Sequence, residues 1–299
     1  MTSADLSTPS PTFSTAKRNQ PPLAMRVLRQ CFAKLGPVFP DLMGRFAVNL
    51  WFSTRRKPQS KEERLFLTTA EDSYSLNVAG NKVPVYVWGE DGPVILLVHG
   101  WEGRTVQFRH LTTALLAKGF RVIGFDAPGH GNAEGSRTNI EEIHYCISQI
   151  AHNYGPIHGV LAHSFGGVST SFAMRHGLKP QRVVLVNSAC DYRYVVSTFQ
   201  SMLNLPEKVT AAMVARTRKM FAHWPQSMEA TMNVDQNAPR FDCPALVIHD
   251  LDDPVVLPSQ GKRIAATWPG AVLHTTQGFG HSKILAAPEV VKKITEFFL

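Results

Sequence analysis

Short apolar runs alternate with helical patterns over most of this chain. Runs such as residues 94–98 are apolar without a break, as expected for parallel strands that are buried on both faces of a sheet. Between these runs the apolar residues recur at helical spacing, for example over residues 140–154. The alternation predicts an α/β fold with a mostly parallel sheet flanked by helices. We expect parallel strands at residues 94–98, 121–125, 158–162, 182–186, 245–248 and 272–275.

Two earlier segments follow a different pattern. Residues 73–79 and 83–88 alternate apolar and polar positions on either side of Gly80-Asn81, which is typical of an antiparallel hairpin. With this hairpin at one edge, the predicted sheet has eight strands. In open α/β sheets ligands bind at the carboxyl ends of the strands, so functional residues are expected there.

Residues 190–242 contain no clear strand, and this stretch is far longer than an ordinary connection between a strand and a helix. We interpret it as a small helical cap on the body. Its apolar residues, Tyr194, Phe199 and Met202 among them, either line a pocket for an acyl or aromatic group or pack the cap on the body.

The N-terminal part carries most of the charge. Residues 1–65 hold eleven basic and four acidic side chains, a net charge of +7 in a chain whose total is +8. Residues 1–22 are rich in Ser, Thr and Pro and are predicted to be a disordered tail. Apolar residues at helical spacing predict helices over residues 23–35 and 42–51. We expect residues 23–65 to be a basic helical segment packed on the body, and residues 66–299 to be one domain that includes the cap.

The basic segment leaves two alternatives open, contact with an anionic membrane surface and a lid over the active site, and we favour packing on the body over both. Nucleic-acid binding is not expected, since no recognition motif accompanies the charge. No apolar run approaches the ~20 residues of a membrane span, and no apolar signal core precedes Lys17-Arg18. The four cysteines show no paired or metal-binding spacing. These features predict a cytoplasmic protein with reduced thiols.

A serine stands where the strand at residues 158–162 is expected to turn into a helix. The segment Ala162-His163-Ser164-Phe165-Gly166 is close to the nucleophile elbow G-x-S-x-G, with Ala162 in place of the first glycine. Small residues let the strand and helix backbones approach each other, and the sharp turn holds the hydroxyl clear of both. Ser164 is therefore a candidate nucleophile.

The chain supplies the other parts of a serine hydrolase in a particular order. The strand at residues 94–98 ends in His99-Gly100-Trp101, where an oxyanion hole would form. The strand at residues 245–248 runs into an acidic turn at residues 249–254, and His281 follows in a glycine-rich segment. Serine, acid, histidine is the order known for α/β-hydrolases, and it differs from that of other serine hydrolases.

On these motifs the chain resembles the α/β-hydrolase superfamily from about residue 73 to the C-terminus. Residues 126–131 look like the family's D-x-P-G-x-G segment. Residues 249–256 resemble its H-G-x-x-D-x-x-V segment, with Asp250 where glycine is usual, and this alignment puts the acid at Asp253. Residues 98–104 are similar to those of a bacterial, carboxylesterase-like subgroup with a serine nucleophile.

The resemblance implies the α/β-hydrolase fold and a division of roles among five residues. Ser164 would be the nucleophile, His281 the base, and Asp253 the acid that orients the imidazole. The backbone N–H groups of Trp101 and Phe165 would form the oxyanion hole. The implied activity is cleavage of a small-molecule carboxylic ester through an acyl-enzyme, with no cofactor and no metal.

Several alternatives remain at this point. Asp250, Asp252 and Asp191 compete with Asp253 for the role of the acid. A thioesterase or an acyltransferase would form the same acyl-enzyme, and a catalytically silent binding protein would keep the fold without the reaction. Four histidines near strand ends are assigned to orienting loops through hydrogen bonds rather than to catalysis: His99, His130, His163 and His249.

Overall fold

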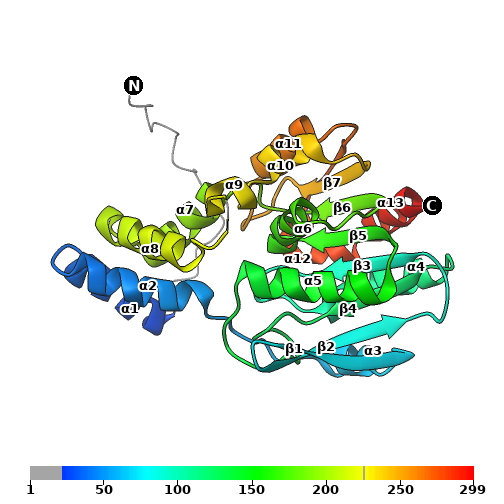
Figure 1. Ribbon diagram of the computed structural model, residues 1–299, viewed down its shortest axis with the longest axis horizontal. Coiled ribbons are helices and arrows are strands. Elements are labelled where there is room, and N and C mark those ends of the chain that lie inside the picture. The colour runs from blue at the N-terminus through cyan, green and yellow to red at the C-terminus, as the bar shows by residue number, and fades with distance from the viewer. Residues whose placement is uncertain (1–21, 225) are drawn as a thin grey trace.

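The computed structural model describes residues 22–224 and 226–299, and an eight-stranded sheet forms its centre (Figure 1). Each predicted strand is present, with ends that differ from the prediction by at most two residues. The tail expected over residues 1–22 lies, apart from Pro22, outside the described residues. The strands are β1 (Asp72–Val78), β2 (Asn81–Trp88), β3 (Val94–Val98), β4 (Arg121–Phe125), β5 (Ile157–His163), β6 (Arg182–Val186), β7 (Ala245–Asp250) and β8 (Val272–Thr276).

The sheet is mostly parallel, as the pattern predicted. The strand order is β1-β2-β4-β3-β5-β6-β7-β8, with β2 antiparallel to both β1 and β4 and parallel pairing from β4 to β8. The two residues between β1 and β2, Ala79 and Gly80, have φ values of 49° and 84°, as a two-residue hairpin turn requires. Strand β3 is buried along its whole length, which explains its unbroken apolar sequence.

Helices cover both faces of the sheet because the strand residues alternate between two cores. Val94, Leu96 and Val98 of β3 face one core, while Ile95 and Leu97 face the other. The first core is closed by α5 (Ile140–Tyr154), α6 (Phe165–Arg175) and α11 (Pro258–Thr267), and the second by α4 (Arg109–Leu116) and α13 (Pro288–Phe298). Short turns complete the body: η1 (Thr105–Phe108), α12 (Gly280–Lys283) and η3 (Ile284–Ala286).

The stretch between β6 and β7 is helical. It contains α7 (Tyr192–Leu203), α8 (Glu207–Met220), α9 (Met228–Met232), α10 (Val234–Asn237) and η2 (Ala238–Arg240). Asp191 begins α7 by accepting a hydrogen bond from the backbone N–H of Tyr194. Helices α7 and α8 lie beyond the carboxyl ends of the central strands, at the left of Figure 1, whereas α10 lies beside α11.

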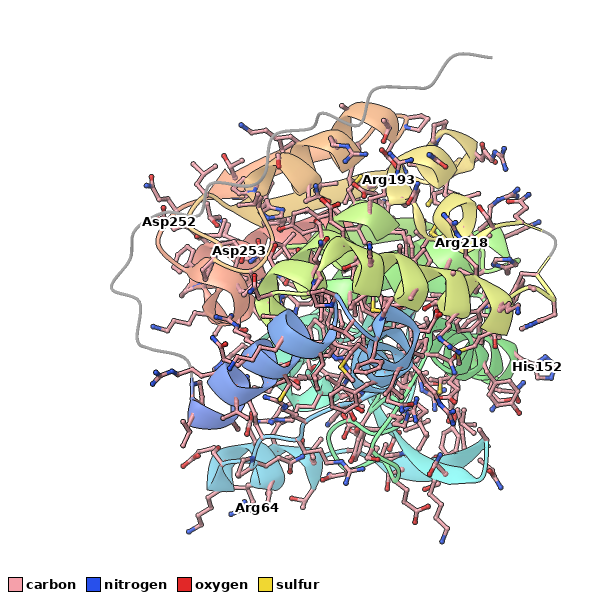
Figure 2. The ribbon with its side chains drawn as sticks, turned by 90° about the vertical axis from the view of Figure 1, so that its left-hand side faces the viewer. Arg64, His152, Arg193, Arg218, Asp252 and Asp253 are labelled. Carbon is pink, nitrogen blue, oxygen red and sulfur yellow. The ribbon has the colours of Figure 1, made fainter. Side chains whose placement is uncertain are left out.

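The N-terminal helices are α1 (Leu23–Leu35), α2 (Pro40–Phe52) and a third, α3 (Lys61–Leu67), that the apolar pattern did not predict. Helix α3 contacts the η1 turn of the body, α1 lies against α7, and α2 packs against the cap helix α8. The contact is close: a Cβ added at Gly44 of α2 would lie 2.6 Å from the Cβ of Ala212 on α8. In Figure 2, α1 and α2 lie beside α8 in front of the body. Within the described part of the chain, no helix combines the length and hydropathy needed to span a membrane.

Candidate active site

Ser164 occupies the corner between β5 and α6. Its backbone has φ 55° and ψ −124°, a conformation that non-glycine residues rarely adopt and that is typical of a strained functional turn. The N–H of Ser164 donates to the carbonyl of Val186 on the neighbouring strand β6, at 2.9 Å. The turn therefore holds the serine side chain clear of both backbones, as expected for a nucleophile elbow.

The small residues around Ser164 let three backbones meet. A Cβ at Gly166 would lie 2.2 Å from the carbonyl oxygen of Val98, and a Cβ at Gly100 would lie 2.6 Å from the Cβ of Ser164. Ala162, which replaces the first glycine of the motif, is fully buried in the sheet. An alanine is thus accommodated at that position, whereas glycine is required where the loop after β3 passes the serine.

His281 links the serine to a carboxylate. Its Nε2 lies 3.0 Å from the Oγ of Ser164, and its Nδ1 lies 2.7 Å from Oδ2 of Asp253. The other oxygen of Asp253 accepts hydrogen bonds from the backbone N–H groups of Val255 and Val256, at 2.7 and 3.0 Å. The structure therefore brings the three predicted residues into one hydrogen-bonded chain, from loops that follow β5, β7 and β8.

The rival aspartates have other partners. Asp252 is exposed, and Figure 2 shows it toward the outer edge of the loop that also carries Asp253. Asp191 caps α7 and forms an ion pair with Arg263 at 2.5 Å. Among the described residues, neither accepts a hydrogen bond from His281.

Asp250 organises the loop that carries His281. Its buried carboxylate accepts hydrogen bonds from the hydroxyl of Thr276 and from the N–H groups of Phe279 and Gly280. Burial by itself would raise the pKa of Asp250, but these hydrogen bonds outweigh it and hold the pKa below its usual value. The unusual Asp250 in the motif is thus explained by a positioning role that the sequence did not indicate.

Two further side chains hold the backbone of His281. The amide of Asn187 donates to the carbonyls of Gly280 and His281, each at 3.1 Å, and Nε2 of His163 donates to the carbonyl of His281 at 2.7 Å. Burial first, and then the nearby His281, lowers the pKa of His163 to about 3, so His163 is neutral and able to donate. Asn187 was missed in the sequence because a single asparagine after a strand carries no distinctive motif.

The proposed oxyanion donors lie beside the serine. Phe165 is the first residue of α6, so its N–H has no acceptor within the helix, and its ring packs edge to face on that of Trp101 with 5.7 Å between centroids. The loop that bears Trp101 is held by His99, which accepts from the N–H of Ala127 at 2.9 Å and donates to the carbonyl of Gly100 at 2.8 Å. Burial lowers the pKa of His99 to about 4, which keeps it neutral for both bonds.

A cavity of about 540 Å³ opens above these groups. Ser164 and His281 form its floor, and the cap and the N-terminal helices form its walls together. Trp51 of α2 packs edge to face on Phe199 of α7, with 4.9 Å between centroids, where the two walls meet. The apolar lining includes Met25, Leu28, Leu50, Trp51, Tyr192, Phe199, Met202 and Phe221. In the described part of the chain, no cluster of three His, Cys, Asp or Glu residues is arranged to hold a metal ion.

Comparisons with known proteins agree with this architecture. A family model described as the alpha/beta hydrolase fold matches residues 93–233. A hydrolase from Pseudomonas aeruginosa PA01 superposes with a TM-score of 0.57 at 19% identity, covering 76% of this chain and 98% of that one. The esterase EaEST from Exiguobacterium antarcticum superposes with a TM-score of 0.57 at 17% identity, covering 75% and 98%. At these identities the likeness concerns the fold.

A curated relative is more similar in sequence. The lysophosphatidylserine lipase ABHD12 of Danio rerio is 26% identical over an aligned length of 226 residues, and the match covers 69% of this chain. The chain spans 58% of the length of that relative. The match extends the similarity well beyond the short motifs around Ser164.

Proposed function

The chain belongs to the α/β-hydrolase superfamily, and from that premise we propose that it is a serine hydrolase that cleaves carboxylic esters. The single observation that carries the proposal is the hydrogen-bonded chain from Ser164 through His281 to Asp253, with distances of 3.0 and 2.7 Å. A serine hydroxyl needs an adjacent base to attack a carbonyl carbon near neutral pH. Each part of this arrangement has a role in that chemistry.

Acylation begins when the Ser164 oxygen attacks the ester carbonyl and Nε2 of His281 takes the hydroxyl proton. The Asp253 carboxylate holds Nδ1–H and stabilises the imidazolium that forms. The backbone N–H groups of Trp101 and Phe165 donate to the developing oxyanion, a contribution of about 3 to 4 kcal/mol per donor in comparable sites. The imidazolium then protonates the departing alkoxide, leaving an acyl group on Ser164.

Deacylation repeats these steps with water. His281 removes a proton from a water molecule that attacks the acyl carbonyl, and the tetrahedral intermediate collapses to release the carboxylic acid and restore the Ser164 hydroxyl. The apolar cavity walls would hold the acyl chain during both steps. No cofactor takes part in the proposed reaction.

Labelling with a fluorophosphonate probe tests this proposal. The wild-type protein should form a covalent adduct on Ser164, located by mass spectrometry of its peptides, and Ser164→Ala should lose both labelling and ester hydrolysis with an unchanged circular dichroism spectrum. Ser282→Ala is a matched control, because Ser282 lines the same cavity but has no role in the proposed reaction. Labelling that persists in folded Ser164→Ala would refute the assignment.

A substrate panel then separates the reactions that share this acyl-enzyme. It compares p-nitrophenyl esters of increasing chain length with acyl-CoA thioesters, lactones and, because of the lipase named above, lysophosphatidylserine. We expect the highest kcat/KM for an oxygen ester. A dominant rate on a thioester would identify a thioesterase, and transfer to an added alcohol in preference to water would identify an acyltransferase. The absence of labelling and of hydrolysis would favour a binding protein.

A further inference from the structure

The segment of residues 53–57 follows α2, lies outside the named helices and strands, and contributes to the cavity lining. Its even-numbered residues are bound to the body. The hydroxyl of Thr54 donates to the carbonyl of Gly129 at 2.8 Å, and the guanidinium of Arg56 donates to the carbonyls of Ala133 and Gly135. These bonds fix the rotation of the segment about its own axis.

The odd-numbered residues have a different environment. Ser53, Arg55 and Lys57, which alternate along the chain with Thr54 and Arg56, all line the cavity. The carbonyl of Lys57 accepts a hydrogen bond from Arg104 at 3.0 Å, which places Lys57 beside the turn that follows Trp101. Two cationic residues therefore belong to the cavity lining, and the backbone of one of them, Lys57, lies beside the turn that follows Trp101.

The carboxylates and ammonium or guanidinium groups of the lining sum to a positive charge. Glu102 is the carboxylate in the lining, against the two cations Arg55 and Lys57. Among the described residues, no carboxylate lies within 4 Å of either cation. The remaining lining from α1, α2 and α7 is predominantly apolar. The cavity thus combines a predominantly apolar lining with two cationic residues.

We propose that the substrate is a single-chain ester with an aliphatic acyl group and an anionic group, a carboxylate or a phosphate, on its alcohol part. This inference rests on the proposed esterase function. The acyl chain contacts the apolar lining, and the anionic group faces Arg55 and Lys57. Exposed charges of this kind act through salt-screened attraction and charge-assisted hydrogen bonds, so they favour an anionic ester over a neutral one of the same length.

The test compares two soluble esters with the same acyl chain, octanoylglycerol and octanoylglycerol 3-phosphate. The wild-type protein should prefer the phosphate ester, and Arg55→Gln/Lys57→Gln should lower kcat/KM on it by about tenfold or more at low salt. On the neutral ester the double variant should stay within about twofold of wild type. Lys61→Gln/Arg216→Gln removes the same charge from exposed positions outside the cavity and should leave both rates unchanged.

Equal kcat/KM of the wild type on the two esters, or an equal loss on both in the double variant, would overturn the assignment of the anionic group. In both cases the wild-type protein still hydrolyses the neutral ester, and its Ser164 is still labelled by the probe. Failure of the proposed function is different, because labelling and hydrolysis of both esters would be absent in the wild-type protein.

A separate observation concerns the outside of the same helices. While Met25 and Leu28 of α1 line the cavity, Leu23, Val27 and Leu35 are exposed at 72%, 55% and 44% of their surface. The exposed apolar side chains continue through the turn into α2. We name this surface the outer α1–α2 face, formed by Leu23, Val27, Leu35, Val38, Phe39, Leu42 and Phe46.

The outer α1–α2 face combines apolar and cationic side chains. Arg26 and Lys34 line a shallow hollow together with Leu23, Val27 and Leu35, and Arg45 is exposed on α2. So many exposed large apolar residues within one helical pair are unusual for a monomer and mark an interaction surface. Cations beside apolar groups match a lipid surface, where acyl chains lie beneath anionic phosphates.

We infer that the outer α1–α2 face docks on an anionic lipid bilayer. The protein should sediment with phosphatidylglycerol-containing vesicles at low salt, less as salt rises, and far less with pure phosphatidylcholine vesicles. Val27→Gln/Leu35→Gln/Leu42→Gln should abolish binding, with unchanged probe labelling as a check of folding. Leu65→Gln/Tyr145→Gln/Leu299→Gln, which changes three exposed apolar residues elsewhere, should still bind.

Failure to sediment at low salt would overturn this inference, as would equal binding by the two triple variants. If light scattering instead shows a dimer that the first triple variant dissociates, and vesicles do not bind, the face is an interface between two copies of the chain.

Discussion

At the residue scale, three aspartates within four positions have different partners. Asp250 accepts hydrogen bonds from the loop before His281, Asp252 is exposed, and Asp253 accepts from His281. The three share a charge and a place after β7, so local sequence does not separate them. Besides nearby N–H groups, the donors to Asp250 and Asp253 come from β8 and the loop that follows it, and the sheet brings these near.

The first prediction concerns the acid of the proposed mechanism. Asp253→Asn should reduce kcat by roughly 10⁴, as the equivalent change does in a serine protease, because an amide no longer stabilises the imidazolium. Asp252→Asn should stay within about twofold of wild type, since Asp252 is exposed. Steady-state kinetics on a short p-nitrophenyl ester measures both. A larger loss at Asp252 would transfer the role to that residue.

Asp250 leads to a second prediction. The carboxylate of Asp250 accepts hydrogen bonds from several donors through its two oxygens. The side-chain amide of Asp250→Asn has only one acceptor oxygen, so some of these donors lose their partner. We expect the free energy of unfolding to fall by about 1 to 3 kcal/mol and fluorophosphonate labelling of Ser164 to slow, because the loop before His281 loses its anchor. Urea unfolding and labelling kinetics provide the two readings. Unchanged labelling in a destabilised variant would limit Asp250 to a structural role.

At the element scale, the cavity depends on how α2 meets α8. Gly44 and Ala212 allow these helices to approach closely, and α2 contributes Leu50 and Trp51 to the cavity wall. The sequence predicted a helix over residues 42–51 and a helical cap over residues 190–242, but not the contact between them, because the apolar pattern of a helix shows which face is buried and not which partner buries it. The cap and the N-terminal segment thus form one wall.

This contact leads to a third prediction. In Gly44→Ala the new Cβ would lie 2.6 Å from that of Ala212, so the helices must separate. The free energy of unfolding should fall by about 1 to 3 kcal/mol, and kcat/KM for an octanoate ester should fall more than for an acetate ester. Adding Ala212→Gly should recover part of both losses in a double-mutant cycle. Additive effects of the two changes would contradict the proposed contact.

At the scale of the whole molecule, the body buries neutral histidines at the carboxyl ends of its strands. Burial is the main cause that lowers the pKa of His99 to about 4, and of His130 and His163 to about 3. Each donates a hydrogen bond to a backbone carbonyl. The loops around Ser164 are therefore held by buried imidazoles whose neutral form is favoured in the folded protein.

A fourth prediction follows for stability. In the unfolded chain these histidines bind protons below a pH of about 6.5, whereas in the folded protein they do so only below about 4 or 3. The unfolded state therefore binds more protons in this window, and stability is lost as the pH falls from 6.5 toward 4. Each histidine contributes about 1.4 kcal/mol per pH unit.

Urea unfolding at pH 7.5, 6 and 5 measures the fourth prediction. His99→Gln is the matched variant. It should reduce the slope of the free energy of unfolding against pH by the equivalent of about one proton per molecule. A free energy of unfolding that does not change between pH 7.5 and 5 would contradict the prediction.

The sequence alone determined the eight strands, their mostly parallel arrangement and the elbow at Ser164. These features are local, because buried strands need continuous apolar residues and a tight strand-to-helix turn needs small ones. It also supplied Asp253 and His281 as candidates through short motifs. The tertiary structure decided what these residues touch: the anchors at Asp250 and Asn187, the joint wall of α2 and the cap, and the cavity side of Arg55 and Lys57. Such contacts join residues far apart in the chain, and a local pattern carries no information about which distant partner a side chain will meet.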